Sequence, residues 1–286
     1  MMRLLHKKWV LNLLIGFFAA VFLVSTGLIV YELLQSNKNR DEYDTLAGMV
    51  DHFQDYLPSA TENAENGAPD ASTDNKEGTG YGLIYIADPE TGVSVPIMEK
   101  YAQIYLLNND LVGWLTIPGT RVNYPVMQTP DEPNYYLKRN FYKESSKYGC
   151  LYAQQICDVA APSDNVTIFG HNMKDSSMFA DLLKYQRKNF FEEHPTLIFD
   201  TLTEHHEYEI FSVFITTATS GSGFPYHQFV DAKDEGEFDN FVRMCKGYSL
   251  YDTGVDAEYG DKFICLSTCE YTHTNGRFVV VAKRID

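Results

Sequence analysis

The sequence predicts a mainly β protein, an eight-stranded barrel with helical insertions that follows an N-terminal transmembrane helix and an acidic stalk. Three observations predict this class. Twenty-three consecutive residues near the N-terminus carry no formal charge. The next stretch, 36–90, is acidic, with twelve Asp and Glu against three Lys and Arg. Eight short runs bounded by turn formers come after it, which is typical of a closed or nearly closed barrel.

The uncharged run Trp9–Tyr31 is long enough to cross a membrane. As a helix it would measure roughly 34 Å, against a hydrocarbon core of about 30 Å. Basic residues precede the run, so the positive-inside rule predicts a single-pass protein of the cell membrane. Residues 1–8 would be cytoplasmic, residues 9–34 would form the signal anchor, and the remaining chain would lie on the extracellular face. The alternative is a cleaved signal peptide, but the run is long for one and no small-x-small site closes it.

Residues 35–94 are expected to form a juxtamembrane helix and an acidic flexible stalk. Apolar residues of 41–57 recur near helical spacing, whereas 58–82 are mostly small, polar or acidic. A packed domain is expected over 95–286. The formal net charge of −16 argues against a nucleic-acid partner, because phosphate binding needs basic patches.

The elements of the packed domain follow from local patterns. Pro96 and the apolar residues after it predict a helix that reaches Leu106. Ser176 and Ser177 are expected to cap a second helix over 178–186, and 231–248 shows an acidic start and helical spacing. The predicted strands are 113–117, 122–128, 150–154, 165–170, 196–200, 208–217, 262–269 and 277–285.

The five cysteines do not form an obvious disulfide framework, because an exported scaffold of that kind has an even number. Cys265 and Cys269 share one predicted strand. Their Cα atoms would lie about 13 Å apart at roughly 3.3 Å per residue, whereas a disulfide needs less than about 7 Å. We therefore expect this pair to stay reduced.

Cys269 and Arg277 flank a segment rich in turn formers that contains an Asn-Gly pair. Two antiparallel strands joined this way would place a thiol and a guanidinium side by side at one end of a sheet. A neighbouring positive charge favours the thiolate, which is the reactive nucleophile. The pattern therefore predicts covalent chemistry at sulfur.

His171 is the candidate acid and base of such chemistry, because it follows an apolar strand and a glycine at a strand end. Arg277 would also donate hydrogen bonds to the oxyanion that forms when the thiolate attacks a carbonyl. Each residue alone has a structural alternative. A single cysteine at a strand end is commonly a small core residue, and the other two could belong to a turn and an exposed strand.

Two further clusters have other interpretations. Cys265, Cys269 and His273 are spaced four apart and would share a helix face as zinc ligands can. This interpretation fails if the segment is extended, and its composition favours a strand. The cluster 204–207, Glu-His-His-Glu, lies between two predicted strands and is interpreted as a solvated turn rather than a site.

Several ordered motifs together resemble the class B sortases. Leu266-Ser267-Thr268-Cys269-Glu270 with Arg277 resembles the catalytic end of that family. So do Phe169-Gly170-His171-Asn172-Met173 and the early strand segments 112–118 and 124–128. The resemblance covers about 104–285 and the membrane anchor. It implies a sortase-type barrel, and class B members carry a long helix where 231–248 lies.

The resemblance also implies roles for individual residues. The family nucleophile falls on Cys269, its histidine on His171 and its arginine on Arg277. Contacts to the sorting peptide fall on three further positions. No metal or other cofactor is implied, in contrast to calcium-stimulated class A. The three peptide-contacting positions are Leu137, Ser267 and Glu270.

The implied activity is cysteine transpeptidation in a Gram-positive-type envelope. The enzyme would cleave a C-terminal sorting signal of exported proteins through a thioacyl intermediate, then pass the acyl group to a peptidoglycan cross-bridge amine or a pilin lysine. Two alternatives remain open from the residues: a cysteine peptidase that uses water as acceptor, and a non-catalytic envelope receptor. Cys265 and Asn172 depart from the family pattern, which leaves peptide preference open.

Overall fold

The computed structural model describes residues 2–52, 82–219 and 221–286. The chain divides into two units, of which the first ends at Thr45 and the second begins at Leu46. The predicted stalk over 58–82 lies outside the described residues except for its last position.

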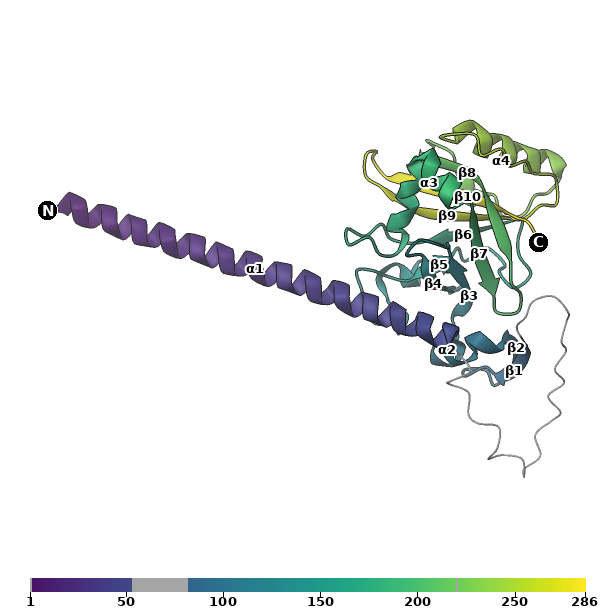
Figure 1. Cartoon of the computed structure of the whole chain (residues 1–286), viewed down its shortest axis with the longest axis horizontal. Helices are drawn as coiled ribbons and strands as arrows, with labels where there is room; N and C mark the ends of the chain where they lie inside the picture. Colours follow the sequence, from purple (N-terminus) through teal and green to yellow (C-terminus); the bar gives the residue numbers. More distant parts are fainter. Residues whose placement is uncertain (1, 53–81, 220) are drawn as a thin grey trace, which may run out of the picture. The chain divides into compact units, whose positions relative to one another are not determined.

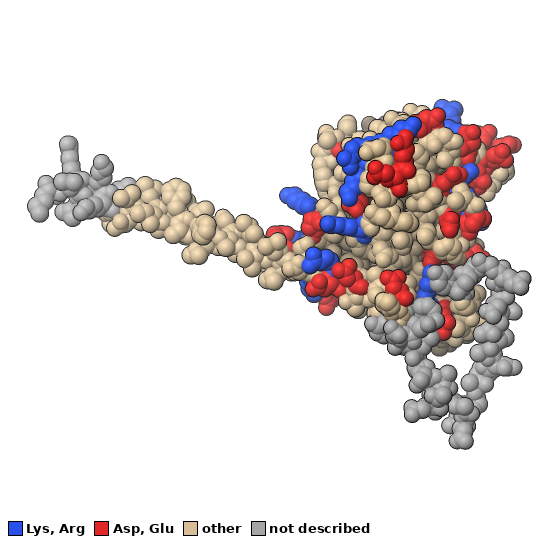
Figure 2. Space-filling view, in the orientation of Figure 1, with Lys and Arg blue, Asp and Glu red and all other residues tan. Residues whose placement is uncertain are grey.

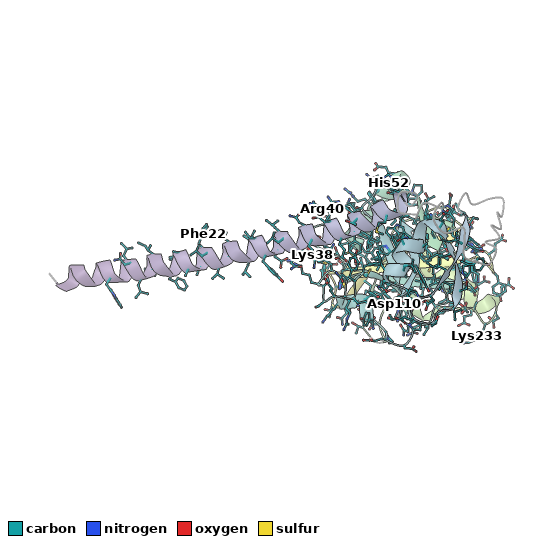
Figure 3. The ribbon with its side chains drawn as sticks, turned by 90° about the horizontal axis from the view of Figure 1, so that it is seen from below. Phe22, Lys38, Arg40, His52, Asp110 and Lys233 are labelled. Carbon is teal, nitrogen blue, oxygen red and sulfur yellow. The ribbon has the colours of Figure 1, made fainter. Side chains whose placement is uncertain are left out.

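The first unit lies within one continuous helix, α1 (Met2–Asp51). We expected two helices, over 9–34 and from 41 onward. The residues between them contain no glycine or proline, so nothing breaks the hydrogen-bond ladder. The apolar part of α1 is exposed, and the helix is long and apolar enough to cross a membrane. Figure 2 shows a stretch of α1 without charged side chains, and Figure 3 shows Phe22 projecting from it, with Lys38 and Arg40 further along.

The second unit begins its regular structure earlier than predicted. A hairpin of β1 (Leu83–Ala87) and β2 (Ser94–Met98) precedes the short helices η2 (Glu99–Tyr101) and α2 (Ala102–Leu107). The predicted helix forms as η2 and α2, but its predicted start at Pro96 is wrong, because that residue pairs with Tyr85 in the hairpin. Proline lacks a donor but is tolerated on an edge strand, and this sheet has only edges.

The eight predicted strands close into a barrel in the order β10-β8-β7-β3-β4-β5-β6-β9, which confirms the predicted fold. Two neighbouring pairs, β4 with β5 and β6 with β9, are parallel, and the others are antiparallel. The barrel therefore depends on pairings between strands far apart in the sequence. The strands are β3 (Leu111–Thr116), β4 (Asn123–Met127), β5 (Leu151–Ala153), β6 (Asn165–Phe169), β7 (Thr196–Thr201), β8 (Glu207–Thr217), β9 (Phe263–Glu270) and β10 (Gly276–Arg284).

Helix α4 (Glu235–Tyr248) covers one face of the barrel (Figure 1). It begins at the N-cap Asp234, whose carboxylate accepts from the backbone N–H of Glu237 at 2.9 Å. Its buried residues pack on an aromatic cluster with strands β8 to β10. This layer buries the outer side of those strands, so β10 is apolar on both faces. The aromatic members of the cluster are Phe211, Phe214, Phe224, Tyr226, Phe238, Phe241 and Phe263.

The predicted helix over 178–186 forms as the 3₁₀ helix η4 (Phe179–Gln186), followed by α3 (Lys188–Glu193). The predicted serine cap is wrong. The Ser177 hydroxyl donates to Asp175 at 2.7 Å, and the residue before the helix is Met178, with φ 55° and no side-chain cap. The serine cap is absent because Met178, and not a serine, directly precedes the first helical residue.

Two short 3₁₀ helices complete the unit. The first, η3 (Tyr135–Lys138), lies before β5 and contains Leu137, and its Tyr136 is fully buried. The second, η5 (Tyr226–Gln228), lies between β8 and α4. Both belong to connections between barrel elements, which is where binding groups concentrate on a rigid scaffold.

Candidate active site

Cys269 and Arg277 are cross-strand partners at the end of the β9–β10 hairpin. The guanidinium Nη1 lies 3.9 Å from the Cys269 sulfur, and it also donates to the Gly276 carbonyl at 3.0 Å. Cys269 is partly exposed, whereas the other four cysteines are buried and all five are free. The structure thus brings a thiol that solvent can reach next to a fixed positive charge.

The parallel pair β6–β9 carries His171 to the same end of the barrel. The register aligns Phe169 with Ser267. Strand β9 continues through Cys269, and His171 lies two residues past the end of β6. The backbone N–H of Gly170 continues the pairing by donating to the Ser267 carbonyl at 3.1 Å. Residues far apart in the chain are therefore delivered to neighbouring strand ends.

The imidazole of His171 has a defined orientation. Its Nε2 lies 2.7 Å from the carbonyl oxygen of Leu137. Because a carbonyl only accepts hydrogen bonds, Nε2 must carry a proton, and the neutral ring keeps its lone pair on Nδ1. Gly149 packs beside the ring, since a Cβ built there would lie 3.2 Å from the His171 Cδ2. Proton exchange at this residue therefore falls to Nδ1.

Four aromatic or imidazole side chains lie near enough to interact electrostatically with the Arg277 guanidinium, three of them also with the Cys269 thiol, and sequence reasoning missed them. Burial raises the pKa of Tyr152 to about 12, with Arg277 opposing the shift and Cys269 adding to it. The pKa of His227 is lowered mainly by burial and further by the positive charge of Arg277. Their residue types gave no signal, because they come from three separate segments: β5, η5 and the β9–β10 turn. The four are Tyr152, Tyr226, His227 and Tyr271.

Leu137, Ser267 and Glu270, the three peptide-contacting positions expected from the resemblance, all lie near Cys269 or His171 but differ in exposure. Leu137 is 37% exposed, and its backbone carbonyl accepts the hydrogen bond from His171. Ser267 is 1% exposed, and its hydroxyl lies 2.5 Å from the hydroxyl of Tyr226. The Ser267 side chain is thus buried against Tyr226, and its contact with a sorting peptide stays a prediction.

Glu270 is also buried and is used by its own turn. Its carboxylate accepts from the backbone N–H groups of Thr272 and His273 and lies 3.0 Å from the His273 Nδ1. Burial favours the neutral carboxyl, but these hydrogen bonds outweigh it and lower the pKa of Glu270 to about 2. The residue therefore holds the turn between Cys269 and Arg277.

Neither the zinc-like set Cys265, Cys269 and His273 nor the 204–207 cluster forms a metal site among the described residues. Cys265 is buried within extended β9, and among residues 2–52, 82–219 and 221–286 no three His, Cys, Asp or Glu side chains gather as metal ligands do. In the 204–207 turn, His205 pairs with Asp200 at 2.6 Å and the neighbouring His206 is buried. The turn is thus less solvated than expected.

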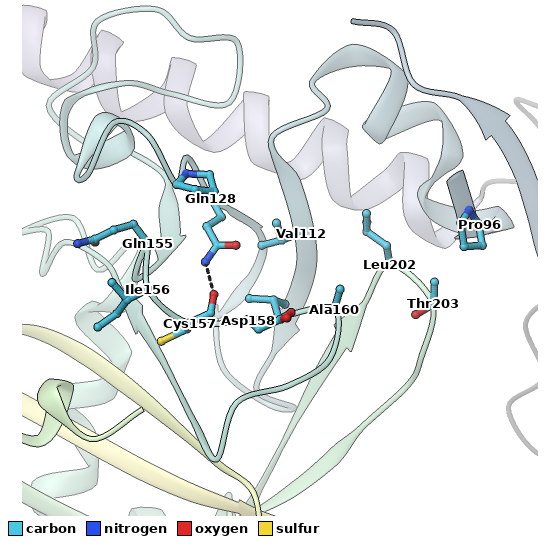
Figure 4. A pocket seen from close by; sticks show the side chains of 12 residues that line it. Pro96, Val112, Gln128, Gln155, Ile156, Cys157, Asp158, Ala160, Leu202 and Thr203 are labelled. Atoms are coloured by element: carbon cyan, nitrogen blue, oxygen red, sulfur yellow. Dashed lines mark hydrogen bonds between the residues drawn. The ribbon is translucent and has the colours of Figure 1, made fainter. Parts of the chain in front are cut away.

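A separate cavity of about 510 Å³ opens beside β3, β4 and the loop after β5 (Figure 4). The Gln128 amide donates across it to the Cys157 carbonyl at 2.8 Å. Its lining is mainly apolar and includes Val112, Ile156 and Leu202. None of its lining residues is Cys269, His171 or Arg277, so the cavity is distinct from the candidate site.

A closed eight-stranded barrel with a cysteine, histidine and arginine at its strand ends defines a class of cysteine transpeptidases. The Sortase domain model matches residues 115–285. The chain therefore belongs to the sortase family, and its relatives place it with the class B members.

Three relatives illustrate the similarity. The chain is 34% identical to sortase B of Listeria monocytogenes over 205 residues, covering 71% of this chain and 81% of that protein. The structure of Bacillus anthracis sortase B with AAEK1 is 26% identical with a TM-score of 0.65, covering 89% of this chain and 99% of that one. A Staphylococcus aureus sortase B–substrate complex matches the fold with a TM-score of 0.68 at 23% identity, covering 88% and 99%.

Proposed function

We propose that this sortase cleaves the C-terminal sorting signal of exported proteins and transfers the new acyl end to an amine of the peptidoglycan cross-bridge or of a pilin. The observation that carries the proposal is the cross-strand pair of Cys269 and Arg277 at the strand end where β6 delivers His171. Related proteins support the substrate classes. One sortase B has been solved with its substrate, and a sortase B has also been solved with triglycine.

In the proposed first half-reaction, the Cys269 thiolate attacks the carbonyl carbon of the scissile peptide bond. A carbon–sulfur bond forms, and the carbonyl oxygen becomes an oxyanion that Arg277 stabilises by hydrogen bonding. Collapse of this intermediate breaks the carbon–nitrogen bond. The leaving amine takes a proton from doubly protonated His171 at Nδ1, because Nε2 is bonded to Leu137.

The second half-reaction reverses these steps with a new amine. The incoming amine attacks the thioacyl carbon and gives its proton to Nδ1 of His171, and the carbon–sulfur bond breaks to restore the thiolate. Arg277 again stabilises the oxyanion. Water in place of the amine would release a free acid, which is the peptidase alternative.

We further propose that α1 anchors the enzyme, with the N-terminus in the cytoplasm and the barrel on the outer face.

The test uses the full chain in detergent with a panel of sorting-motif peptides, with and without triglycine or a lysine peptide. Mass spectrometry should show an amine-dependent transfer product and its loss in Cys269→Ala. Cys265→Ala is the matched control, because this cysteine lies on the same strand but is buried. Cleavage that survives Cys269→Ala would overturn the assignment, and free acid alone in the presence of amine would favour a peptidase.

A further inference from the structure

The residues on both sides of His171 are hydrogen-bonded through side chains to the strand that carries Cys269. The Thr268 hydroxyl donates to the Gly170 carbonyl at 2.7 Å. The Asn172 amide donates to the Cys269 carbonyl at 3.1 Å. Strand β6 ends at Phe169, so these two bonds extend the β6–β9 contact past the last residues of the regular ladder.

Neither side chain is placed to react with substrate. Side chains alternate along a strand, so Thr268 and Cys269 point to opposite faces of β9. Thr268 is 2% exposed, and its hydroxyl is turned to the Gly170 carbonyl. Asn172 meets the main-chain oxygen of Cys269 and not its sulfur. Both contacts therefore act on the main chain.

The carbonyl groups of His171 and Asn172 are also hydrogen-bonded. The backbone N–H of Phe179 donates to the His171 carbonyl at 2.9 Å. The Tyr271 hydroxyl donates to the Asn172 carbonyl at 3.4 Å, which adds a second link to the β9–β10 turn. With the ring fixed on Leu137, the position of Nδ1 relative to the sulfur depends on how the main chain of 170–172 is held against β9.

We propose that Thr268 and Asn172 are positioning residues that bracket His171 and set the distance between its Nδ1 and the Cys269 sulfur. The inference rests on the proposed function, in which a proton moves between Nδ1 and an amine attached to the acyl carbon on that sulfur. Such transfer requires hydrogen-bond reach. A misplacement of about 1 Å costs about 100-fold in rate.

The experiment compares Thr268→Val, Asn172→Ala and the double variant in the full chain. Each single variant should lower kcat for transfer about tenfold and the double variant about 100-fold, with KM changed less than about twofold. The rate of Cys269 alkylation by iodoacetamide should match that of the wild type, because Thr268 and Asn172 position His171 and not the sulfur. Thr268→Ser should recover most of the lost kcat, since it restores the hydroxyl donor.

Thr201→Val is the matched control, because Thr201 is equally buried, at 1% exposure, and its hydroxyl also bonds main-chain groups, but on β7. It should lower the melting temperature and leave kcat unchanged. Unchanged kcat in folded Thr268→Val and Asn172→Ala would overturn the proposal. So would a Thr268→Ser variant no better than Thr268→Val.

Amide hydrogen exchange of 170–172 separates this proposal from the proposed function. If the Thr268 and Asn172 hydrogen bonds hold this segment, amide exchange at 170–172 should be at least about tenfold faster in Thr268→Val and Asn172→Ala than in Thr201→Val, whether or not the protein transfers peptides. If the wild-type protein showed no transfer activity, the proposed function would be refuted, but the hydrogen-exchange comparison would still test the positioning role of Thr268 and Asn172. Equal exchange rates at 170–172 in all three variants would refute the positioning role of Thr268 and Asn172.

Discussion

Replacing Gly149 by alanine tests whether the orientation of His171 is set by the backbone beneath it. Gly149 has φ +61°, a conformation that costs an alanine about 1–2 kcal/mol. The new Cβ would lie 2.7 Å from the Tyr136 carbonyl oxygen and 2.8 Å from that of Leu137, so these atoms must shift. Overpacking of this kind adds about 1–3 kcal/mol. The sum predicts a loss of roughly 2–5 kcal/mol in the free energy of unfolding.

The shift reaches the active site through one hydrogen bond. The displaced Leu137 oxygen is the acceptor for the His171 Nε2, and the new methyl group would also lie 3.2 Å from the ring. A displacement of several tenths of an ångström should lower kcat about tenfold or more. Alkylation of Cys269 should be unaffected, since Arg277 is not displaced.

The assay pairs peptide transfer kinetics with calorimetry, and Gly254→Ala is the control. Gly254 has φ +76° with nothing within 4 Å of an added Cβ, so it isolates the backbone strain from the contact. Gly254→Ala should lower the melting temperature by about 2–4 °C per kcal/mol and keep wild-type kcat. If Gly149→Ala turns over like the wild type, or loses no more stability than Gly254→Ala, the reasoning is refuted.

Three further predictions concern charge and capping. Arg277→Lys keeps the charge but loses the planar donor geometry, so kcat should fall about 10²–10³-fold in transfer assays, and wild-type turnover would contradict the oxyanion role. Asp234→Ala removes the α4 N-cap and should cost about 1 kcal/mol in unfolding, with turnover intact; an unchanged denaturation midpoint would refute the cap. Glu270 has a folded pKa of about 2 against an ordinary value of 4.5, so its contribution to stability is complete above 4.5 and is lost as pH falls through 2. The stability gap between wild type and Glu270→Gln should therefore shrink over that window, and a gap independent of pH would contradict the assignment.

Local patterns in the sequence predicted most of the fold. The apolar run within α1 and the eight strands were visible because period and turn chemistry are properties of neighbouring residues. The hairpin β1–β2 was missed, since Pro96 suggested a helix start and its pairing with Tyr85 could not be seen locally. The serine cap failed because Met178 stands between Ser177 and the first residue of η4, and the local pattern does not show where the helix begins.

The sequence by itself determined the pairing of Cys269 with Arg277, because only seven residues rich in turn formers separate them, which leaves little choice of register. Only the tertiary structure decided that His171 lies at the same end of the barrel, that its Nε2 meets the Leu137 carbonyl, and that Ser267 is buried against Tyr226. The physical reason is the parallel β6–β9 pair. Its strands are joined by a long crossover, so which residues become neighbours is decided by closure of the whole barrel.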